Sequence, residues 1–298
     1  MSQIATPADA GPAVDPVDPL PDDSARRLPR LATVLGWVGG AVVVALVLIA
    51  VFAPQLAPYD PTERVGVPFS PPGADHLLGT NDVGQDLLSE LIHGTRVSLL
   101  VGIVAATVAI VIGGTIGTVA GYYPRRLGAT LMRGVDVVLI LPFLPLLIVL
   151  AAYLGRSLIT TTLVIGSLIW AGSARVIRSQ VLSLRTRDYV LAAKSMGATD
   201  RWAIRRHVLP RTALLASGEF VQATASAILL EAALSFLGLG DPLQKSWGSI
   251  LYWAQVRGAF FGPAWKWWVL PPGLMIMAAS LGFALLAFSL EERINPRL

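Results

Sequence analysis

The chain has 298 residues, of which 54% are hydrophobic and 14% are charged, and its mean hydropathy is +0.64. Soluble domains carry roughly 25% charged residues, so this composition indicates a membrane protein. The lack of cysteine excludes disulfides and thiolate metal sites. The net charge of +4 is distributed over several segments between apolar runs, which argues against a nucleic-acid-binding surface.

The first 30 residues differ in composition from the rest of the chain. They are rich in Pro, Ala and Asp and have no apolar periodicity, which predicts a disordered tail over 1–30. Three arginines then precede an apolar run of about 20 residues. The apolar region of a signal peptide is about 7–15 residues long and ends at a small-residue cleavage site, so a retained membrane helix fits this run better.

Six apolar runs are long enough to cross roughly 30 Å of hydrocarbon. They lie at 32–52, 97–121, 134–154, 157–173, 213–237 and 269–290. The fold class is therefore all-α, a polytopic bundle of six transmembrane helices. Only residues 155–157 separate the third and fourth runs, which predicts a tight hairpin.

Lysine and arginine placement predicts the orientation of the chain. With the N-terminus inside, seventeen of these residues fall on the cytoplasmic side and six on the other. We expect both termini in the cytoplasm. The predicted organisation is a cytoplasmic tail (1–30), a first helix with an extracytoplasmic loop (31–96) and a helix-bundle domain (97–298) that contains a cytoplasmic segment at 185–211.

Glycines recur at four-residue spacing in the second run, at Gly113, Gly117 and Gly121. Small residues at this spacing form a groove in which another helix can approach closely. The pattern predicts ordinary close packing in a compact bundle.

The cytoplasmic segment, hereafter the two-helix loop (residues 185–211), has the local chemistry of helix, tight turn and helix. Residues 188–196 can form a short helix with Val190, Ala193 and Met196 near one face. Gly197 stands where a helix would end with positive φ, and Thr199 can cap the next helix. Asp200 falls in the first turn of that helix, and Pro210 ends the helix or starts the next element.

Basic and apolar side chains alternate through the second half of this loop. Arg201, Arg205 and Arg206 provide a basic surface, whereas Trp202, Ile204 and Val208 provide apolar anchors. Three interpretations compete: a loop that only faces lipid phosphates, a nucleic-acid-binding element, and a protein-docking element. The tight membrane flanks disfavour nucleic acid.

Several motifs occur together in one order. The loop sequence YVLAAKSMGATDRWAIRRHVLP (189–210) is preceded by HLLGTNDVGQDLLS (76–89) and GTRVSL (94–99). It is followed by EAALSFLGLG (231–240), Pro242 and SWG (246–248), then by WW (267–268), PPG (271–273) and NPR (295–297). Together they resemble the permeases of ATP-binding-cassette (ABC) importers, specifically the C-type subunit of the dipeptide/oligopeptide/nickel family, and cover roughly 70–298.

The resemblance implies the type I ABC importer permease fold over 97–298 and an EAA-like loop that couples to an ATPase. Three positions depart from the family's motifs. Leu191 stands where the EAA motif has its Glu, Gln85 stands where Arg is usual, and the sequence of residues 291–294 differs from the more common C-terminal motif. The resemblance assigns the ATPase-coupling role to a set of loop residues, namely Tyr189, Ala192, Ala193, Gly197, Ala198, Thr199, Asp200, Arg201, Trp202, Arg205, Leu209 and Pro210.

The chain has no G-x-x-x-x-G-K-[ST] phosphate loop. We therefore expect no catalytic role and no cofactor in this chain, with ATP and Mg²⁺ bound by two partner ATPase subunits. The resemblance further implies a B-type permease partner, an extracytoplasmic substrate-binding protein meeting outer loops 53–96 and 238–268, and a location in the bacterial inner membrane. Alternatives are an importer of nickel or another small solute, an ion-coupled secondary transporter, and a membrane enzyme, for which no catalytic residue set is evident.

Acidic residues inside the apolar runs are candidates for the translocation path, because charges in hydrocarbon usually face a cavity or a partner. Glu219, Gln222 and Ser226 share one helical face and form what we call the polar stripe. The stripe could line the path, or Glu219 could meet Arg211 or a neighbouring helix near the cytoplasmic interface. Glu231, near the outer end, is assigned to a gate or a structural hydrogen bond in preference to substrate contact.

Histidines and aromatic residues give weaker indications. His76, His93 and His207 are far apart in sequence, so we expect no metal site. An outer group of aromatic residues suits a belt at the membrane interface, and its members are Trp247, Tyr252, Trp253, Trp265, Trp267 and Trp268.

Overall fold

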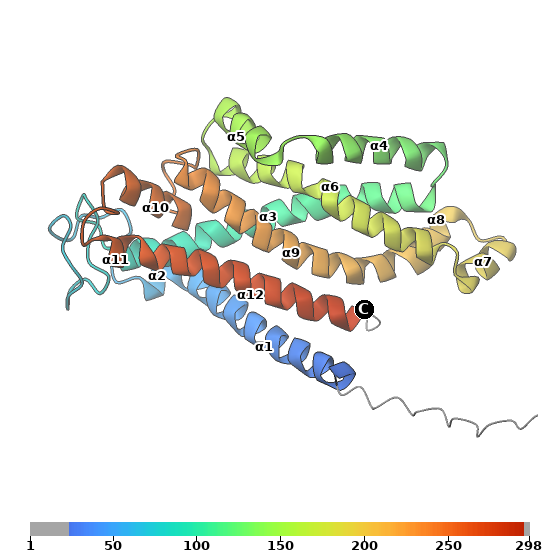
Figure 1. Cartoon of the computed structure of the whole chain (residues 1–298), viewed down its shortest axis with the longest axis horizontal. Coiled ribbons are helices and arrows are strands. Elements are labelled where there is room, and N and C mark those ends of the chain that lie inside the picture. Colours follow the sequence, from blue (N-terminus) through green and yellow to red (C-terminus); the bar gives the residue numbers. More distant parts are fainter. Residues whose placement is uncertain (1–23, 295–298) are drawn as a thin grey trace, which may run out of the picture.

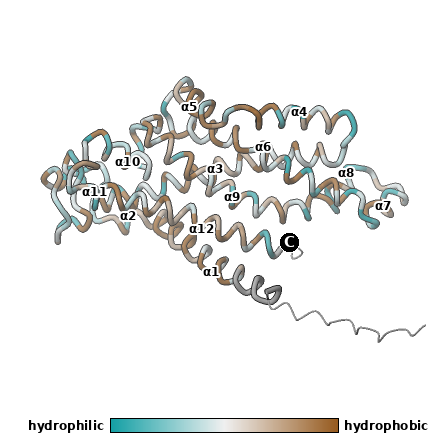
Figure 2. Tube along the Cα trace, in the orientation of Figure 1, coloured by the Kyte–Doolittle hydropathy of each residue, from teal (hydrophilic) through white to brown (hydrophobic). Residues whose placement is uncertain are grey.

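The computed structural model describes residues 24–294, and their side chains from 32 to 292. The residues so described form an elongated bundle of helices without a β-strand (Figure 1). Hydrophobic residues follow the long helices, and hydrophilic residues gather toward the two ends (Figure 2). Most of the tail expected over 1–30 lies outside the described residues.

Long apolar helices make up the bundle. Between residues 24 and 294, five are long and apolar enough to cross a membrane. They are α1 (Ser24–Val51), α3 (Leu87–Tyr122), α6 (Leu158–Leu184), α9 (Leu209–Phe236) and α12 (Leu270–Ile294). α9 is extended at its start by α8 (Asp200–Ala203) and the π-helix η1 (Ile204–Val208).

The expected third span, 134–154, is not one straight helix. It is a pair, α4 (Arg126–Ile140) and α5 (Phe143–Leu154), bent by 86° at the break. The cause is Pro142: the residue before a proline is disfavoured in the helical region, and Leu141 has φ −64° and ψ 140°. Counted as one span, the pair completes the expected six.

Several helices extend beyond the runs expected from hydropathy. α1 begins at Ser24, so the last residues of the expected tail are helical. α3 begins at Leu87 instead of 97, because the Asp86 carboxylate accepts from the Ser89 N–H at 2.8 Å and caps the helix. α6 continues to Leu184 instead of ending at 173.

α3 and α6 pack through the glycines that the sequence singled out. A Cβ placed at Gly113, Gly117 or Gly121 would lie 2.6, 2.6 or 2.9 Å from the carbonyl oxygens of α6 residues, which are Trp170, Ala174 and Arg178 respectively. Only glycine allows this approach, so the predicted groove is confirmed and α6 fills it.

One end of the bundle is closed by what we call the cap, residues 57–86 and 238–268. α2 (Ala53–Leu56) leads into the first of these segments, and α10 (Trp247–Val256) and α11 (Trp265–Trp268) lie in the second. Lys245 Nζ bonds the buried Glu90 carboxylate at 2.6 Å, and Arg257 pairs with Asp82 at 2.8 Å. These ion pairs fasten the two cap segments to each other and to the start of α3.

Two members of the aromatic group do not lie at an interface. Trp247 and Trp268 are 0% and 1% exposed, so the belt interpretation is wrong for both. The Trp247 indole N–H donates to the Leu91 carbonyl at 3.3 Å, and Trp268 packs in the core of the cap with Ile250 and Ala254. Trp247 packs with Leu91 and Ile228 where the cap meets the bundle, and Trp268 is a core residue of the cap.

The opposite end carries the two-helix loop, with α7 (Asp188–Ser195), α8 and η1. The described start of α1 and the described end of α12 also lie toward this end (Figure 1). α3 therefore spans the distance between the cap and the two-helix loop.

Candidate coupling loop and cavity wall

The turn in the two-helix loop is a Schellman motif. Gly197 has φ +89°, the Ala198 N–H donates to the Ala193 carbonyl at 3.0 Å, and the Gly197 N–H donates to the Lys194 carbonyl at 3.0 Å. This is the hydrogen-bond pattern by which a glycine ends a helix. The predicted positive φ at Gly197 and the predicted helix before it are confirmed.

The second helix starts as predicted and continues further than predicted. The Thr199 hydroxyl accepts from the Trp202 N–H at 3.3 Å, which caps α8. Of the two alternatives for Pro210, the second is confirmed: it lies in the first turn of α9 and so starts the next element. It does not end the helical run, because α8, η1 and α9 follow one another as one span.

An apolar cluster holds the loop against the bundle. Val190 of α7, Ala203 of α8 and Val208 of η1 pack with residues at the ends of α3 and α6, which are Tyr122, Ile177 and Val181. Ala193 is also buried, whereas Met196 is 82% exposed and does not share the buried face expected for it. The loop is thus a folded element with a core of its own.

The outer surface of the loop combines an aromatic side chain with cations. An open pocket of about 380 Å³ is lined by Thr199, Arg201, Trp202, Arg205 and Arg206. Of the expected apolar anchors, Trp202 is 47% exposed on this surface, whereas Val208 is buried in the core of the loop. An exposed tryptophan rimmed by arginines is the composition of a protein-docking surface.

A polar contact joins the two helices of the loop to α3. Lys194 of α7 pairs with Asp200 of α8 at 2.8 Å, and the Tyr122 hydroxyl of α3 donates to the same carboxylate oxygen at 3.1 Å. The Lys194 ammonium also lies 5.3 Å from the centroid of the Tyr122 ring. The hydrogen bond to Asp200 raises the pKa of Lys194, so the ammonium is charged at neutral pH.

The polar stripe lies where the sequence predicted, on one face of α9. Glu219, Gln222 and Ser226 all line an open cavity of about 600 Å³, whose other wall comes from residues such as Phe143, Leu168 and Ser173. Arg211, the alternative partner of Glu219, instead lies 4.6 Å from the centroid of the Tyr189 ring.

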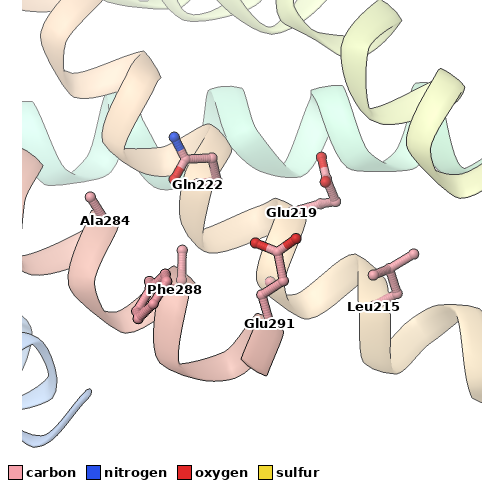
Figure 3. A pocket seen from close by; sticks show the side chains of 8 residues that line it. Leu215, Glu219, Gln222, Ala284, Phe288 and Glu291 are labelled. Carbon is pink, nitrogen blue, oxygen red and sulfur yellow. The ribbon is translucent and has the colours of Figure 1, made fainter. Parts of the chain in front are cut away.

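A second cavity, of about 210 Å³, opens between α9 and α12. Glu219 and Gln222 line it from α9, and Phe288 and Glu291 line it from α12 (Figure 3). Glu219 and Gln222 therefore line cavities on two sides of α9, whereas Ser226 lines only the larger one.

Glu231 is separate from the stripe. It is buried between helices, accepting from the Ser235 hydroxyl at 2.7 Å and the Ser98 hydroxyl at 3.2 Å. The geometry favours the structural-hydrogen-bond interpretation of this residue. Among the described residues, no group of three or more potential ligands could hold a metal ion.

The sequence interpretation of these sites did not find Tyr122, Lys194 or Glu291. Tyr122 and Asp200 are 78 positions apart, so no local pattern links them, and Lys194 carries no signal beyond its charge. Glu291 was treated as part of an unusual C-terminal motif, and only the packing of α12 on α9 brings it to the stripe.

The fold combines a bundle of helices long and apolar enough to cross a membrane with a polar cavity wall and a folded loop at one end. Residues 113–298 match the family described as the binding-protein-dependent transport system inner membrane component. Residues 34–75 match the N-terminal transmembrane domain of oligopeptide transport permease C. The chain belongs to the family of binding-protein-dependent inner-membrane transport components and is a permease subunit of an ABC importer.

Similar proteins have nearly the same length. The chain is 37% identical over 299 residues to the di/tripeptide transport system permease protein of Pseudomonas aeruginosa, covering 96% of each. It is 35% identical to the dipeptide transport system permease protein of Alkalihalophilus pseudofirmus, over 89% of this chain and 86% of that one. The corresponding protein of Bacillus subtilis is 32% identical, over 93% and 85%.

Proposed function

We propose that this permease imports di- or oligopeptides, forming half of a translocation path with a related B-type permease. The observation that carries the proposal is the shared naming of its full-length relatives, which are di/tripeptide and dipeptide transport permeases. A path for peptides must accept many side chains while handling a charged backbone. A wall with one carboxylate, one amide and two hydroxyls among apolar residues suits that task.

We further propose that the two-helix loop and both termini lie in the cytoplasm of a bacterial cell and that the cap faces outward. The support is the asymmetry of Lys and Arg between the two sides. An extracytoplasmic binding protein would then deliver substrate at the cap, which the Lys245–Glu90 and Arg257–Asp82 pairs make rigid.

The two-helix loop is proposed to dock on one of two ATPase subunits, which bind ATP and Mg²⁺. Trp202 would enter an apolar recess of the ATPase, and Arg201, Arg205 and Arg206 would face acidic groups around it. ATP-driven closure of the ATPases would shift the permease between inward-open and outward-open states.

Cross-linking tests the docking. The chain has no cysteine, so Ala198→Cys or Thr199→Cys introduces a single reactive group. We expect either variant to cross-link to an ATPase subunit in an active complex, and Gly262→Cys in the cap to give no such product. Active complexes that fail to cross-link at both loop positions would contradict the docking role.

Transport assays test the substrate class. Proteoliposomes with both permeases, the ATPases and the binding protein should accumulate labelled peptides when supplied with ATP. Uptake of nickel without uptake of any peptide would assign the chain to the alternative substrate. Flux through this chain without ATPase subunits would favour an ion-coupled transporter and overturn the proposal.

A further inference from the structure

The two-helix loop is connected to the bundle by its chain, by apolar packing and by polar contacts. Its chain joins α6 at one end and, through η1, α9 at the other, and its apolar cluster packs on the ends of α3 and α6. The contact of Asp200 with Tyr122 adds a side-chain hydrogen bond to the end of α3. The chain connection through η1 reaches the polar stripe, whereas this hydrogen bond reaches a helix to which the loop is not covalently joined.

We infer that Tyr122 is a positioning residue that transmits movement of the two-helix loop to α3 through its hydrogen bond to Asp200. The inference rests on the proposed docking of this loop to an ATPase. It assigns a route of coupling that the loop's own connection to α9 does not supply.

The contact joins three elements at one carboxylate. Asp200 is held by the Lys194 ammonium at 2.8 Å and by the Tyr122 hydroxyl at 3.1 Å. The remaining titratable group that faces this carboxylate is Tyr123, the residue directly after α3. Since Asp200 belongs to α8 and bonds Lys194 of α7, a displacement of either helix would pull on the Tyr122 hydroxyl.

Tyr122 is itself fixed firmly to its surroundings. Its side chain is 5% exposed and packs with Ile177 and Val181 of α6. Its backbone carbonyl accepts from the Arg185 guanidinium at 2.9 Å. The two-helix loop is thus packed against the ends of α3 and α6. A shift at Asp200 would therefore move the end of α3 and not only the tyrosine ring.

α3 can carry such a movement along the molecule. The glycine groove locks α3 to α6, so the two helices move together. At the far end of α3, Glu90 bonds Lys245 and Asn81 of the cap, at 2.6 and 2.9 Å. The loop is thereby linked through one 36-residue helix to the end at which substrate would enter.

Tyr122→Phe tests the inference, because it removes only the hydroxyl and leaves the ring in the apolar cluster. In the complete transporter in liposomes, we expect ATP hydrolysis and association with the ATPases to be retained. The substrate moved per ATP hydrolysed should fall by about three- to tenfold, the range set by the net contribution of one typical hydrogen bond, because the Asp200 side chain is 40% exposed. Tyr153→Phe, at an exposed tyrosine of α5, is the matched control and should leave the ratio unchanged.

A double variant separates this route from others. Asp200→Asn should lower the same ratio, and combining it with Tyr122→Phe should add little, since both act on one contact. If Tyr122→Phe reduces assembly of the complex, Asp200→Asn in the assembled complex gives the deciding ratio. A wild-type ratio in assembled Tyr122→Phe would overturn the inference, whereas absence of ATP-driven transport in the wild-type complex would instead overturn the proposed function.

Discussion

Replacing Gly117 by alanine tests the packing of α3 on α6. The added Cβ would lie 2.6 Å from the Ala174 carbonyl oxygen and 3.2 Å from the Arg178 nitrogen, both backbone atoms of α6. Backbone cannot move aside as a flexible side chain can, so the helices must separate. Overpacking of this kind costs about 1–3 kcal/mol.

Gly114→Ala is the matched control, one turn away on the same helix. There the nearest atom to an added Cβ is the Ile177 Cδ1, at an ordinary contact distance of 3.7 Å. Both variants gain the same helix propensity, up to about 1 kcal/mol in favour of alanine. The propensity gain cancels when the two variants are compared, so their difference in unfolding free energy isolates the clash.

The assay is reversible unfolding in mixed micelles followed by helical circular dichroism. We expect Gly117→Ala to be less stable than Gly114→Ala by about 1–3 kcal/mol. Equal stability of the two alanine variants would refute the close approach of α3 and α6 at Gly117, and with it the rigid coupling of these helices.

Other perturbations probe the loop, the cap and the buried acid. Gly197→Val places a β-branched residue at φ +89°, a strain of about 1–3 kcal/mol, so ATP hydrolysis should continue with reduced transport; normal coupled transport would contradict this. Lys245→Met leaves the Glu90 carboxylate buried without its cation, and detergent-solubilised protein should lose up to about 3–5 kcal/mol of stability, part of which Glu90→Gln in the same chain should restore. Glu231→Leu should cost about 1–3 kcal/mol in the same unfolding assay, because two buried hydroxyls lose their acceptor, and Glu231→Gln should cost less.

Local chemistry made the two-helix loop predictable. Gly197 follows a short helix and adopts the positive φ that ends it. Thr199 lies three residues before Trp202 and caps the next helix by accepting from its N–H. The glycines of α3 were equally informative, because their spacing matches the helical repeat whatever the partner helix is. These predictions required only contacts within a few residues.

The sequence did not predict the path of a span through the bundle or the contacts between residues far apart in the chain. Hydropathy gives the length of an apolar span but not its path. It therefore did not predict the bend at Pro142, although the proline is visible in the sequence. Aromatic composition suggested an interface for Trp247 and Trp268, yet the ion-paired cap encloses them. The contact between Tyr122 and Asp200 exists only because the whole bundle brings their helices together.

The π-helix η1 determines the angular relation between the loop surface and the polar stripe. The Leu209 N–H bonds the Ile204 carbonyl, an i→i+5 step that contains one residue more than an α-helical turn. Deleting one residue from 204–208 would turn the same Leu209–Ile204 bond into an ordinary α-helical step, so Trp202 and Glu219 would keep nearly the same angular relation. An extra residue in an unbroken α-helix would instead rotate Trp202 relative to Glu219 by about 100°. A chimaera that exchanges this loop between related permeases therefore tolerates a difference of one residue between these two positions only where a π-turn absorbs it.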